Sequence, residues 1–315
     1  MLTIDSSLPA QGAQTSLSRL LALRFPAQQL DIRRRRRALA QLAGGQHSNF
    51  RGRGIEFEEV RGYQPGDDIR AIDWRVTART GEAHTKLFHE ERERPVLLAV
   101  DQRTGMQFGS QHCFKGVLAA ELAALLAWSA LSTNERVGAL LMYENRHWEM
   151  RPRNNRRTVL SILSALAEHD PDENAQEPET TPALSFADML RSARRVARPG
   201  TSVFIVSDFA GADESRAREE LFQLARHCEI TAIHCTDPLE RELPPAGRYA
   251  VTDGKARAEL DTRFKDAKTQ FSADFDTVLE FHREQLQRLG IPLLLARTDT
   301  PPVGLLRRFY GEGRT

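Results

Sequence analysis

The 315-residue chain has few cysteines and no apolar run long enough to cross a bilayer. Its three cysteines are an odd number without a framework spacing, which excludes a disulfide scaffold and favours a reducing compartment. The longest apolar stretch, residues 117–131, falls short of the roughly 20 residues that a membrane helix needs, and it carries Glu121. Residues 1–25 lack the basic and then apolar pattern of a signal peptide. We therefore expect a cytoplasmic protein without membrane insertion.

An excess of charge of either sign is missing as well. The 44 basic and 43 acidic side chains leave a net charge of +1, so no field across the whole molecule favours nucleic acid or an anionic membrane. The exception is local, a run of arginines at residues 33–37. On a helix, consecutive residues point to every face, which favours a solvated helix first, docking on an acidic protein second and nucleic acid last.

Sequence motifs for common catalytic sites are absent. The chain contains no phosphate-binding Gly-x-x-x-x-Gly-Lys-Ser/Thr loop, no Gly-x-Gly-x-x-Gly turn after a strand, no Gly-x-Ser-x-Gly elbow and no His-Glu-x-x-His helix. His234 and Cys235 suggest a zinc pair, but neighbouring residues of a strand point to opposite faces of the sheet. We therefore expect no enzymatic activity and no cofactor.

Strand and helix patterns alternate from residue 95 onward. Residues 96–100 form a continuous apolar run, as expected of a strand buried on both faces, and an Ala- and Leu-rich helix follows at residues 113–131. This alternation continues to residue 296 and predicts an α/β fold with a mainly parallel sheet flanked by helices. We expect four parts: an N-terminal helical segment at 1–50, a strand-turn segment at 51–95 packed on the main domain, an α/β domain at 96–300 and a C-terminal tail at 301–315.

The residues that follow two of the predicted buried strands are polar or small. They are Asp101, Arg103, Thr104 and Gly105 after the first strand, and Ser207 and Asp208 after the strand at residues 202–206. Because the carboxyl ends of parallel strands meet at one edge of a sheet, we expect these residues to lie together. Two neighbouring carboxylates, Asp101 and Asp208, must be paired, hydrated or bound to a metal ion there.

A dense motif precedes the first of these strands. Its typed positions are, in chain order, Arg61, Tyr63, Pro65, Gly66, Asp67, Asp68, Arg70, Trp74 and Arg79. The Pro-Gly pair predicts a type II turn, and one of the two aspartates that follow is expected to cap a short helix running through Trp74. The motif is either a charged face for a partner or, as we favour, a salt-bridged turn that Tyr63, Ile72 and Trp74 anchor on the core.

This motif, followed by the strand that ends in Asp101, resembles the signature of the domain of unknown function 58 family, and the resemblance extends over residues 51–295. It implies a von Willebrand factor A-like fold. Members of that family often lie beside AAA+ ATPases of the MoxR type. The resemblance therefore implies such an ATPase as a partner, in the maturation or assembly of an unknown client protein.

Domains of the von Willebrand factor A type commonly bind Mg²⁺ through an Asp-x-Ser-x-Ser loop, a Thr and a further Asp. The matching positions in this chain are Asp101, then Thr180 or Thr181, then Asp208, whereas Arg103 and Gly105 replace the two serines. We infer that Arg103 supplies the positive charge by a bidentate contact with Asp101 or Asp208. The alternatives are hydrated carboxylates with Arg103 in solvent and, less favoured, Mg²⁺ between the two aspartates.

We therefore expect a non-enzymatic protein-interaction module. Its contact surface, here called the strand-end surface, consists of Asp101, Arg103, Thr104, Gly105, Ser207 and Asp208. By resemblance, the partner is a MoxR-type AAA+ ATPase together with a client protein. The alternatives are a Mg²⁺-dependent, adhesion-type binding domain and, less favoured, a nucleic-acid-binding protein.

Overall fold

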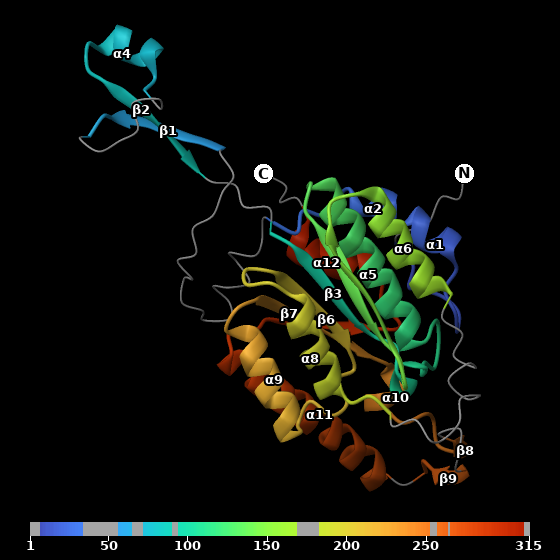
Figure 1. The fold of residues 1–315 in the computed structure, drawn as a ribbon. Coiled ribbons are helices and arrows are strands. Elements are labelled where there is room, and N and C mark those ends of the chain that lie inside the picture. The colour runs from blue at the N-terminus through green and yellow to red at the C-terminus, as the bar shows by residue number, and fades with distance from the viewer. Residues whose placement is uncertain are drawn as a thin grey trace. The chain divides into compact units, whose positions relative to one another are not determined.

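The computed structural model describes two compact units (Figure 1). The described residues are 7–33, 56–64, 72–89, 94–168, 183–252, 257–263 and 265–311. Residues 46–94 form the smaller unit, and residues 1–45 together with 95–315 form the larger one. The predicted strand-turn segment corresponds to the smaller unit, whereas both chain ends belong to the same unit as the α/β domain.

A six-stranded sheet forms the centre of the larger unit, in the order β10-β7-β6-β3-β4-β5. Its strands are β3 (Val96–Asp101), β4 (Val137–Met142), β5 (His147–Arg153), β6 (Ser202–Ser207), β7 (Glu229–Thr236) and β10 (Leu293–Arg297). All neighbouring strands are parallel except β5, which returns antiparallel to β4. β3, β4 and β6 are buried along their whole length, as their mainly apolar sequences predict. The predicted α/β class is confirmed.

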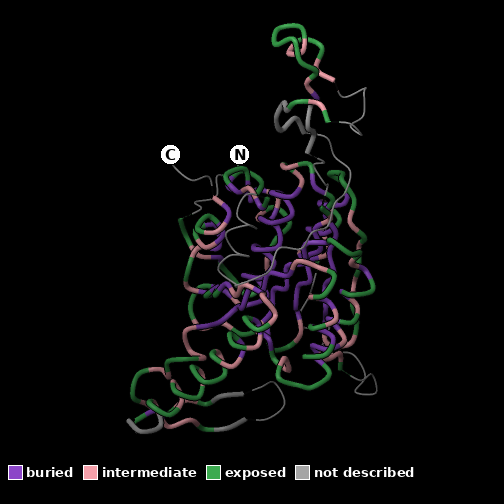
Figure 2. The backbone as a smooth tube through the Cα atoms, turned by 90° about the vertical axis from the view of Figure 1, so that its left-hand side faces the viewer, coloured by how far each residue is buried: buried purple, intermediate pink, exposed green. Residues whose placement is uncertain are grey.

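Helices cover both faces of this sheet (Figure 1). One face carries α1 (Leu17–Ala22), α2 (Arg24–Ala27), α5 (Lys115–Ser132), α6 (Arg156–Ala167) and α12 (Pro302–Tyr310). The other carries α8 (Phe186–Val196), α9 (Ser215–Ala225) and α11 (Lys265–Arg288). The connecting segments contain η2 (Thr104–Met106), α10 (Pro238–Arg241), and a hairpin of β8 (Arg248–Thr252) and β9 (Arg257–Asp261). Each helical layer has its own cluster of buried apolar side chains, and the buried backbone of Figure 2 runs through the sheet between them.

α5 is the central helix of the first layer. It is apolar on nearly every side, which is typical of a helix surrounded by other elements. Within the described residues it is the one helix with the length and composition of a membrane span, with a mean hydropathy of 1.3, and 89 % of it is buried inside the protein. Packing against the sheet and the helices around it therefore accounts for its apolar sequence.

The N-terminal segment packs on α5 instead of forming a separate part. α1 is capped by the Ser16 hydroxyl, and helix ends at Ala27 with α2, so the predicted helical segment at 1–50 is wrong for residues 28–33. Residues 34–50, with most of the arginine run, lie outside the described part of the chain. The Trp128 indole of α5 donates to the backbone carbonyl of Leu20 at 3.1 Å, which fixes α1 to the core.

The C-terminal segment is a helix, not a tail. α12 begins at Pro302, a residue suited to the first turn because its missing N–H would have no partner there. Leu306 and Tyr310 point into the core and are 0 % and 1 % exposed. The predicted tail from residue 301 is therefore wrong for the residues of α12.

The smaller unit contains a two-stranded antiparallel sheet of β1 (Glu56–Gly62) and β2 (His84–His89), with α4 (Trp74–Thr80) between them in the chain. Asp73 caps α4, its carboxylate accepting from the Arg75 backbone N–H at 3.0 Å. The helix that contains Trp74 is therefore capped by Asp73, and not by either aspartate of the predicted turn. Trp74 is 66 % exposed, so it is not buried within the smaller unit, and its predicted role as an anchor on the core stays a prediction. Residues 65–71, with the predicted type II turn, lie outside the described residues.

Candidate functional site

The winding of the chain changes direction between β3 and β6. From β3 the sheet continues to β4 and β5 on one side, and the chain then crosses back to build β6, β7 and β10 on the other. At such a point the loops after the two central strands diverge to opposite faces of the sheet, and the crevice between them is where ligands and partners bind in open α/β folds. Asp101 ends β3, and Ser207 and Asp208 follow each other at the end of β6. The predicted strand-end residues therefore lie together.

Asp101 and Arg103 form a bidentate ion pair. Arg103 Nε donates to Asp101 Oδ1 at 3.0 Å, and Nη2 donates to Oδ2 at 2.8 Å. The Ser207 hydroxyl also donates to Oδ2, at 2.7 Å. The Asp101 side chain has no exposed surface and that of Arg103 has 14 %. The chain itself therefore supplies the cation that a buried carboxylate requires, in one of the two pairings inferred for Arg103.

The guanidinium of Arg103 also joins the loops around the crevice. Its Nη2 donates to the Ala210 carbonyl after β6 at 3.3 Å, and its Nη1 lies 3.5 Å from the Leu184 carbonyl before α8. Burial lowers the pKa of Arg103, but the hydrogen bonds and charge of Asp101 outweigh burial and raise it above its ordinary value. Arg103 therefore stays charged and ties three segments of the chain together.

Lys115, the first residue of α5, neutralises the second carboxylate. Its Nζ donates to Asp208 Oδ2 at 2.9 Å and to Glu240 Oε1 of α10 at 2.6 Å, and the Lys115 side chain is 3 % exposed. Asp208 Oδ1 accepts from the Ala210 backbone N–H at 3.1 Å. Burial raises the pKa of Asp208, but Lys115 and this N–H lower it more, so the pKa lies below its ordinary value. Each strand-end carboxylate thus has its own side-chain cation.

The sequence did not reveal the pairing of Lys115 with Asp208 and Glu240. The partners are separated by 93 and 125 positions, so no local spacing connects them. One signal was available: a lone lysine begins a helix of Ala and Leu residues, and a charge in such surroundings must find a distant partner.

The loop after β3 closes over Asp208 and carries the exposed part of the surface. A Cβ added to Gly105 would lie 2.9 Å from Asp208 Oδ2, so a side chain at this position would displace the carboxylate that Lys115 holds. The backbone N–H and hydroxyl of Thr104 both donate to Glu144 Oε2, at 3.0 and 2.7 Å. Thr104 and Gly105 are exposed, and Phe108 behind them is 41 % exposed. This loop is the accessible part of the strand-end surface, because Asp101 and Ser207 are fully buried.

The residues at this end of the sheet do not fit a divalent cation in the observed arrangement. Both oxygens of Asp101 accept from Arg103, and Oδ2 of Asp208 accepts from Lys115, so the ligands that Mg²⁺ prefers are already occupied. No group of three or more His, Cys, Asp or Glu side chains is arranged to hold a metal ion in the described part of the chain. The predicted second-loop positions, Thr180 and Thr181, lie outside it.

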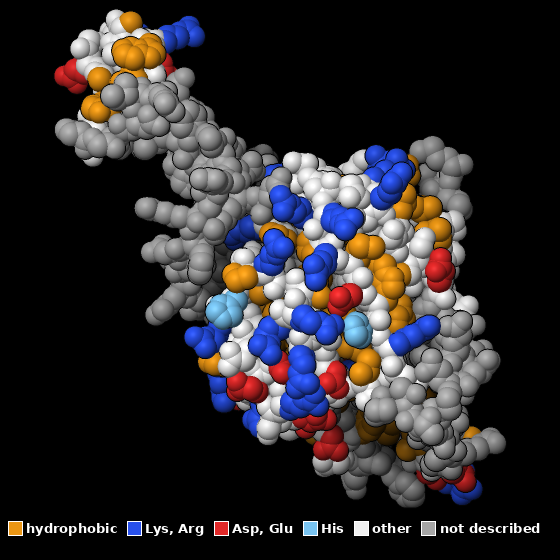
Figure 3. Space-filling model, in the orientation of Figure 1, with side chains coloured by type: hydrophobic (Ala, Val, Ile, Leu, Met, Phe, Trp, Pro, Cys, Tyr) orange, Lys and Arg blue, Asp and Glu red, His pale blue; other side chains and the backbone are white. Residues whose placement is uncertain are grey.

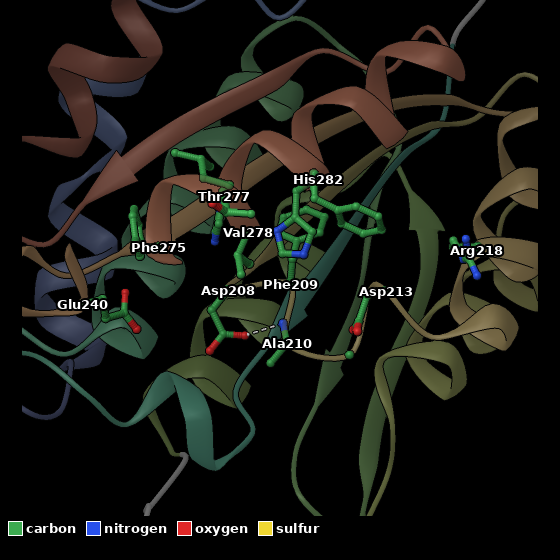
Figure 4. A pocket seen from close by; sticks show the side chains of 14 residues that line it. Asp208, Phe209, Ala210, Asp213, Arg218, Glu240, Phe275, Thr277, Val278 and His282 are labelled. Atoms are coloured by element: carbon green, nitrogen blue, oxygen red, sulfur yellow. Dashed lines mark hydrogen bonds between the residues drawn. The ribbon is translucent and has the colours of Figure 1, made fainter. Parts of the chain in front are cut away.

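A pocket of about 850 Å³ adjoins Asp208 (Figure 4). Residues 208–213, which follow β6, form one side of it, and the α11 residues from Phe275 to His282 form the other. His234 of β7 also lines it. The sequence did not point to this pocket, because it is built from segments that are far apart in the chain.

The outer face formed by α8 and α9 carries charges of both signs (Figure 3). Arg191 and Arg194 of α8 both bind Glu220 of α9 at 3.1 Å, and Arg216 of α9 binds Asp188 of α8 at 2.7 Å. These ion pairs join the two helices to each other. Arg191, Arg194 and Arg216 are therefore engaged within the protein, which does not favour the nucleic-acid alternative for these three.

A family model described as "Protein of unknown function DUF58" matches residues 59–285. A relative from Mycobacterium tuberculosis strain H37Rv, Uncharacterized protein Rv1480, is 31 % identical over 271 residues, which cover 84 % of this chain and 81 % of the relative. Another from Mycobacterium avium, Uncharacterized protein MAV169, is 28 % identical over 156 residues, which cover 46 % of this chain and 89 % of the relative.

Solved structures similar to this chain include a von Willebrand factor type A protein from Catenulispora acidiphila, with 10 % identity, a TM-score of 0.39, and coverage of 84 % of this chain and 50 % of that one. The conserved hypothetical protein BatB from Bacteroides thetaiotaomicron has 13 % identity and a TM-score of 0.37, with coverage of 67 % and 93 %. The fold assignment rests on the sheet order and the two helical layers, not on these scores.

Proposed function

The chain belongs to the DUF58 family, and on this premise we propose that it is a non-catalytic protein-interaction module that serves a MoxR-type AAA+ ATPase as an adaptor or co-chaperone. The ATPase comes from the family resemblance, and the contact surface comes from the crevice at the carboxyl ends of β3 and β6. In this role the protein would connect the ATPase to a client protein during maturation or assembly. A cytoplasmic location, where ATP is supplied, is part of the proposal.

The observation that carries the proposal is that both strand-end carboxylates have cations from the chain itself. Asp101 is held by Arg103 and Asp208 by Lys115, so their charges are satisfied without an ion or a substrate. A surface that is already ordered loses less conformational freedom when a partner binds. This arrangement supports a binding surface more than a reaction centre, because a reaction centre needs a group that is free to exchange protons or attack a substrate.

The loop that carries Thr104 and Gly105 of this surface also offers an aromatic contact. Phe108 is 41 % exposed and lies in this loop, between β3 and α5. Aromatic side chains are enriched in the cores of protein interfaces, because they bury much apolar area with few rotatable bonds. We therefore expect Phe108 to contribute more to binding than the buried aspartates beneath it.

The test measures binding of the purified chain to the neighbouring MoxR-type ATPase by biolayer interferometry in the presence of ATP. Phe108→Asp should weaken binding at least about tenfold, the effect expected when an interface anchor is lost. Phe222→Asp is the matched control, because Phe222 is similarly exposed, at 45 %, but lies on α9. The control should change the affinity less than about twofold, and circular dichroism checks that both variants are folded.

Two results would contradict different parts of the proposal. Equal binding by wild type and Phe108→Asp would remove the loop after β3, the accessible part of the strand-end surface, from the interaction. A wild-type chain that does not bind the ATPase would instead remove the ATPase as partner.

A further inference from the structure

The pocket beside Asp208 has aromatic and aliphatic walls. Phe275, Val278 and Phe281 of α11 line it, and Phe209 lines it from the loop after β6. Figure 4 shows Phe209, Phe275 and Val278 around the pocket. Its volume of about 850 Å³ is large enough for a small molecule or for a large side chain with its neighbours. Val278 is 54 % exposed, so the apolar surface continues from the pocket onto the outside of α11.

Two buried histidines lie in the wall of this pocket without complete hydrogen bonding. His234 is 5 % exposed and His282 is 7 % exposed, and their ring centroids are 5.6 Å apart. The Nδ1 atom of each ring is buried and has no hydrogen-bond partner in the described part of the chain. Buried polar atoms normally have a partner, and one that lacks it lowers stability. A ligand that supplied hydrogen bonds here would remove this cost.

The charges around the pocket disfavour an ionic ligand. An anion would meet the carboxylates of Asp208, Asp213 and Glu240, which outnumber the exposed Arg218, the cation among the lining residues. A cation would find Asp208 and Glu240 already bound to Lys115. Burial lowers the pKa of His234 to about 4 and lowers the pKa of His282, so both imidazoles are neutral near pH 7. The fitting ligand is therefore a neutral group with an aromatic body and a polar end.

We propose that this pocket binds the phenol group of a tyrosine side chain presented by a partner polypeptide. The ring of tyrosine packs among the three phenylalanines, and its hydroxyl reaches the two imidazoles. A hydroxyl can donate to one ring nitrogen and accept from another, whichever of them carries the proton. An indole N–H only donates, and the hydroxyls of serine and threonine lack the apolar body. A polypeptide is favoured over a free phenol because its flanking residues also cover the exposed Val278.

The experiment titrates the full-length, ¹⁵N-labelled protein with N-acetyltyrosine amide and with N-acetylphenylalanine amide, which differ by the hydroxyl alone. Amide shifts of residues 209–213 and 275–282 report binding. The tyrosine probe should bind at least about tenfold more tightly, because the phenylalanine probe leaves the imidazoles unpaired. His282→Phe should reduce this preference to less than about threefold, and His227→Phe, an exposed histidine outside the pocket, should leave it unchanged.

Equal affinity of the two probes, or shifts confined to other residues, would overturn the proposal. So would a preference that persists in a folded His282→Phe protein. If that variant does not fold, Val278→Arg at the exposed edge of the pocket should abolish binding of the tyrosine probe, and binding that survives it would overturn the proposal. p-Cresol tests the source: if it binds as tightly as the tyrosine probe, the partner is not a polypeptide. None of these outcomes depends on the ATPase or on Phe108.

Discussion

Lys115 connects the strand-end surface to the stability of the fold. Its ammonium lies between the carboxylates of Asp208 and Glu240, with 3 % of its side chain exposed. Burial lowers the pKa of Lys115, but Asp208 and Glu240 outweigh burial and raise it, so the amine stays charged. Charged groups that are taken out of water are tolerated only while they remain paired.

Replacement of Lys115 by methionine, which keeps most of the volume and removes the charge, should therefore destabilise the protein strongly. The expected loss is about 3–5 kcal/mol in the free energy of unfolding, because Asp208 is left buried without a cation. Urea unfolding followed by circular dichroism measures it. The matched control is Lys268→Met on α11, which should change stability by less than about 0.5 kcal/mol. A second substitution, Asp208→Asn in the Lys115→Met background, should recover part of this loss, because it removes the unpaired carboxylate. If it recovers none of the loss, Lys115 does not stabilise the fold by pairing with Asp208.

The stability of the protein should depend on pH through His234. The charged or titratable groups that act on its ring are His282 of α11, Asp208 after β6 and Lys115 of α5. Burial is the largest cause that lowers its pKa from 6.5 to about 4, and His282 is the second. As the pH falls from about 6.5 towards 4, the unfolded chain takes up a proton at this imidazole and the folded chain does not, so the folded state loses stability.

The lowered pKa of His234 predicts that the free energy of unfolding falls by about 3 kcal/mol across this pH range. His234→Phe should remove this pH dependence. Urea unfolding of both proteins at several pH values between 4.5 and 7.5 gives the comparison. A stability difference between them that does not change with pH would show that His234 does not titrate in this way.

At the scale of elements, the two C-terminal helices use their surfaces differently. α11 is 24 residues long, and its residues between Phe275 and His282 form a wall of the pocket, whereas Leu286, near its C-terminal end, is buried in the core. α12 is short and carries Gly304 and two prolines near its start, a composition that suggests a tail, yet one face of it is buried on α5. Its helix forms because tertiary packing compensates for weak intrinsic propensity.

Two adjacent leucines of α12 test this packing. Leu306 is 0 % exposed and belongs to the core, whereas Leu305 is half-buried. Leu306→Ala should lower the free energy of unfolding by about 2–5 kcal/mol, and Leu305→Ala by less than about half as much. Thermal or urea unfolding distinguishes the two. Equal, small effects would mean that α12 is not part of the core.

At the scale of the whole molecule, the two units have separate interiors. The two apolar clusters of the larger unit contain residues between Ala10 and Ile32 and from Val96 onward, and no described residue of 46–94 contributes to them. The smaller unit carries the sequence motif that identifies the family, including the exposed Trp74. Its residues therefore do not explain the stability of the α/β domain.

Replacement of residues 46–94 by a flexible Gly-Ser linker should leave the larger unit folded. We expect a cooperative thermal transition within about 5 °C of the full-length value, since the buried clusters are unchanged. Differential scanning calorimetry measures it, and near-ultraviolet circular dichroism checks the packing around Trp128. A broad, non-cooperative transition would show that the smaller unit is needed for the core to form.

The sequence by itself determined which residues form the central strands and where their carboxyl ends lie. Apolar runs such as residues 96–100 predict buried parallel strands, and Asp101 and Arg103 are close enough in the chain to find each other in any such loop. The tertiary structure alone decided that Lys115 meets Asp208 and that His234 meets His282. The reason is physical: these partners are separated by 93 and 48 positions, and their distances are set by how α5 and α11 pack on the sheet, about which local patterns carry no information.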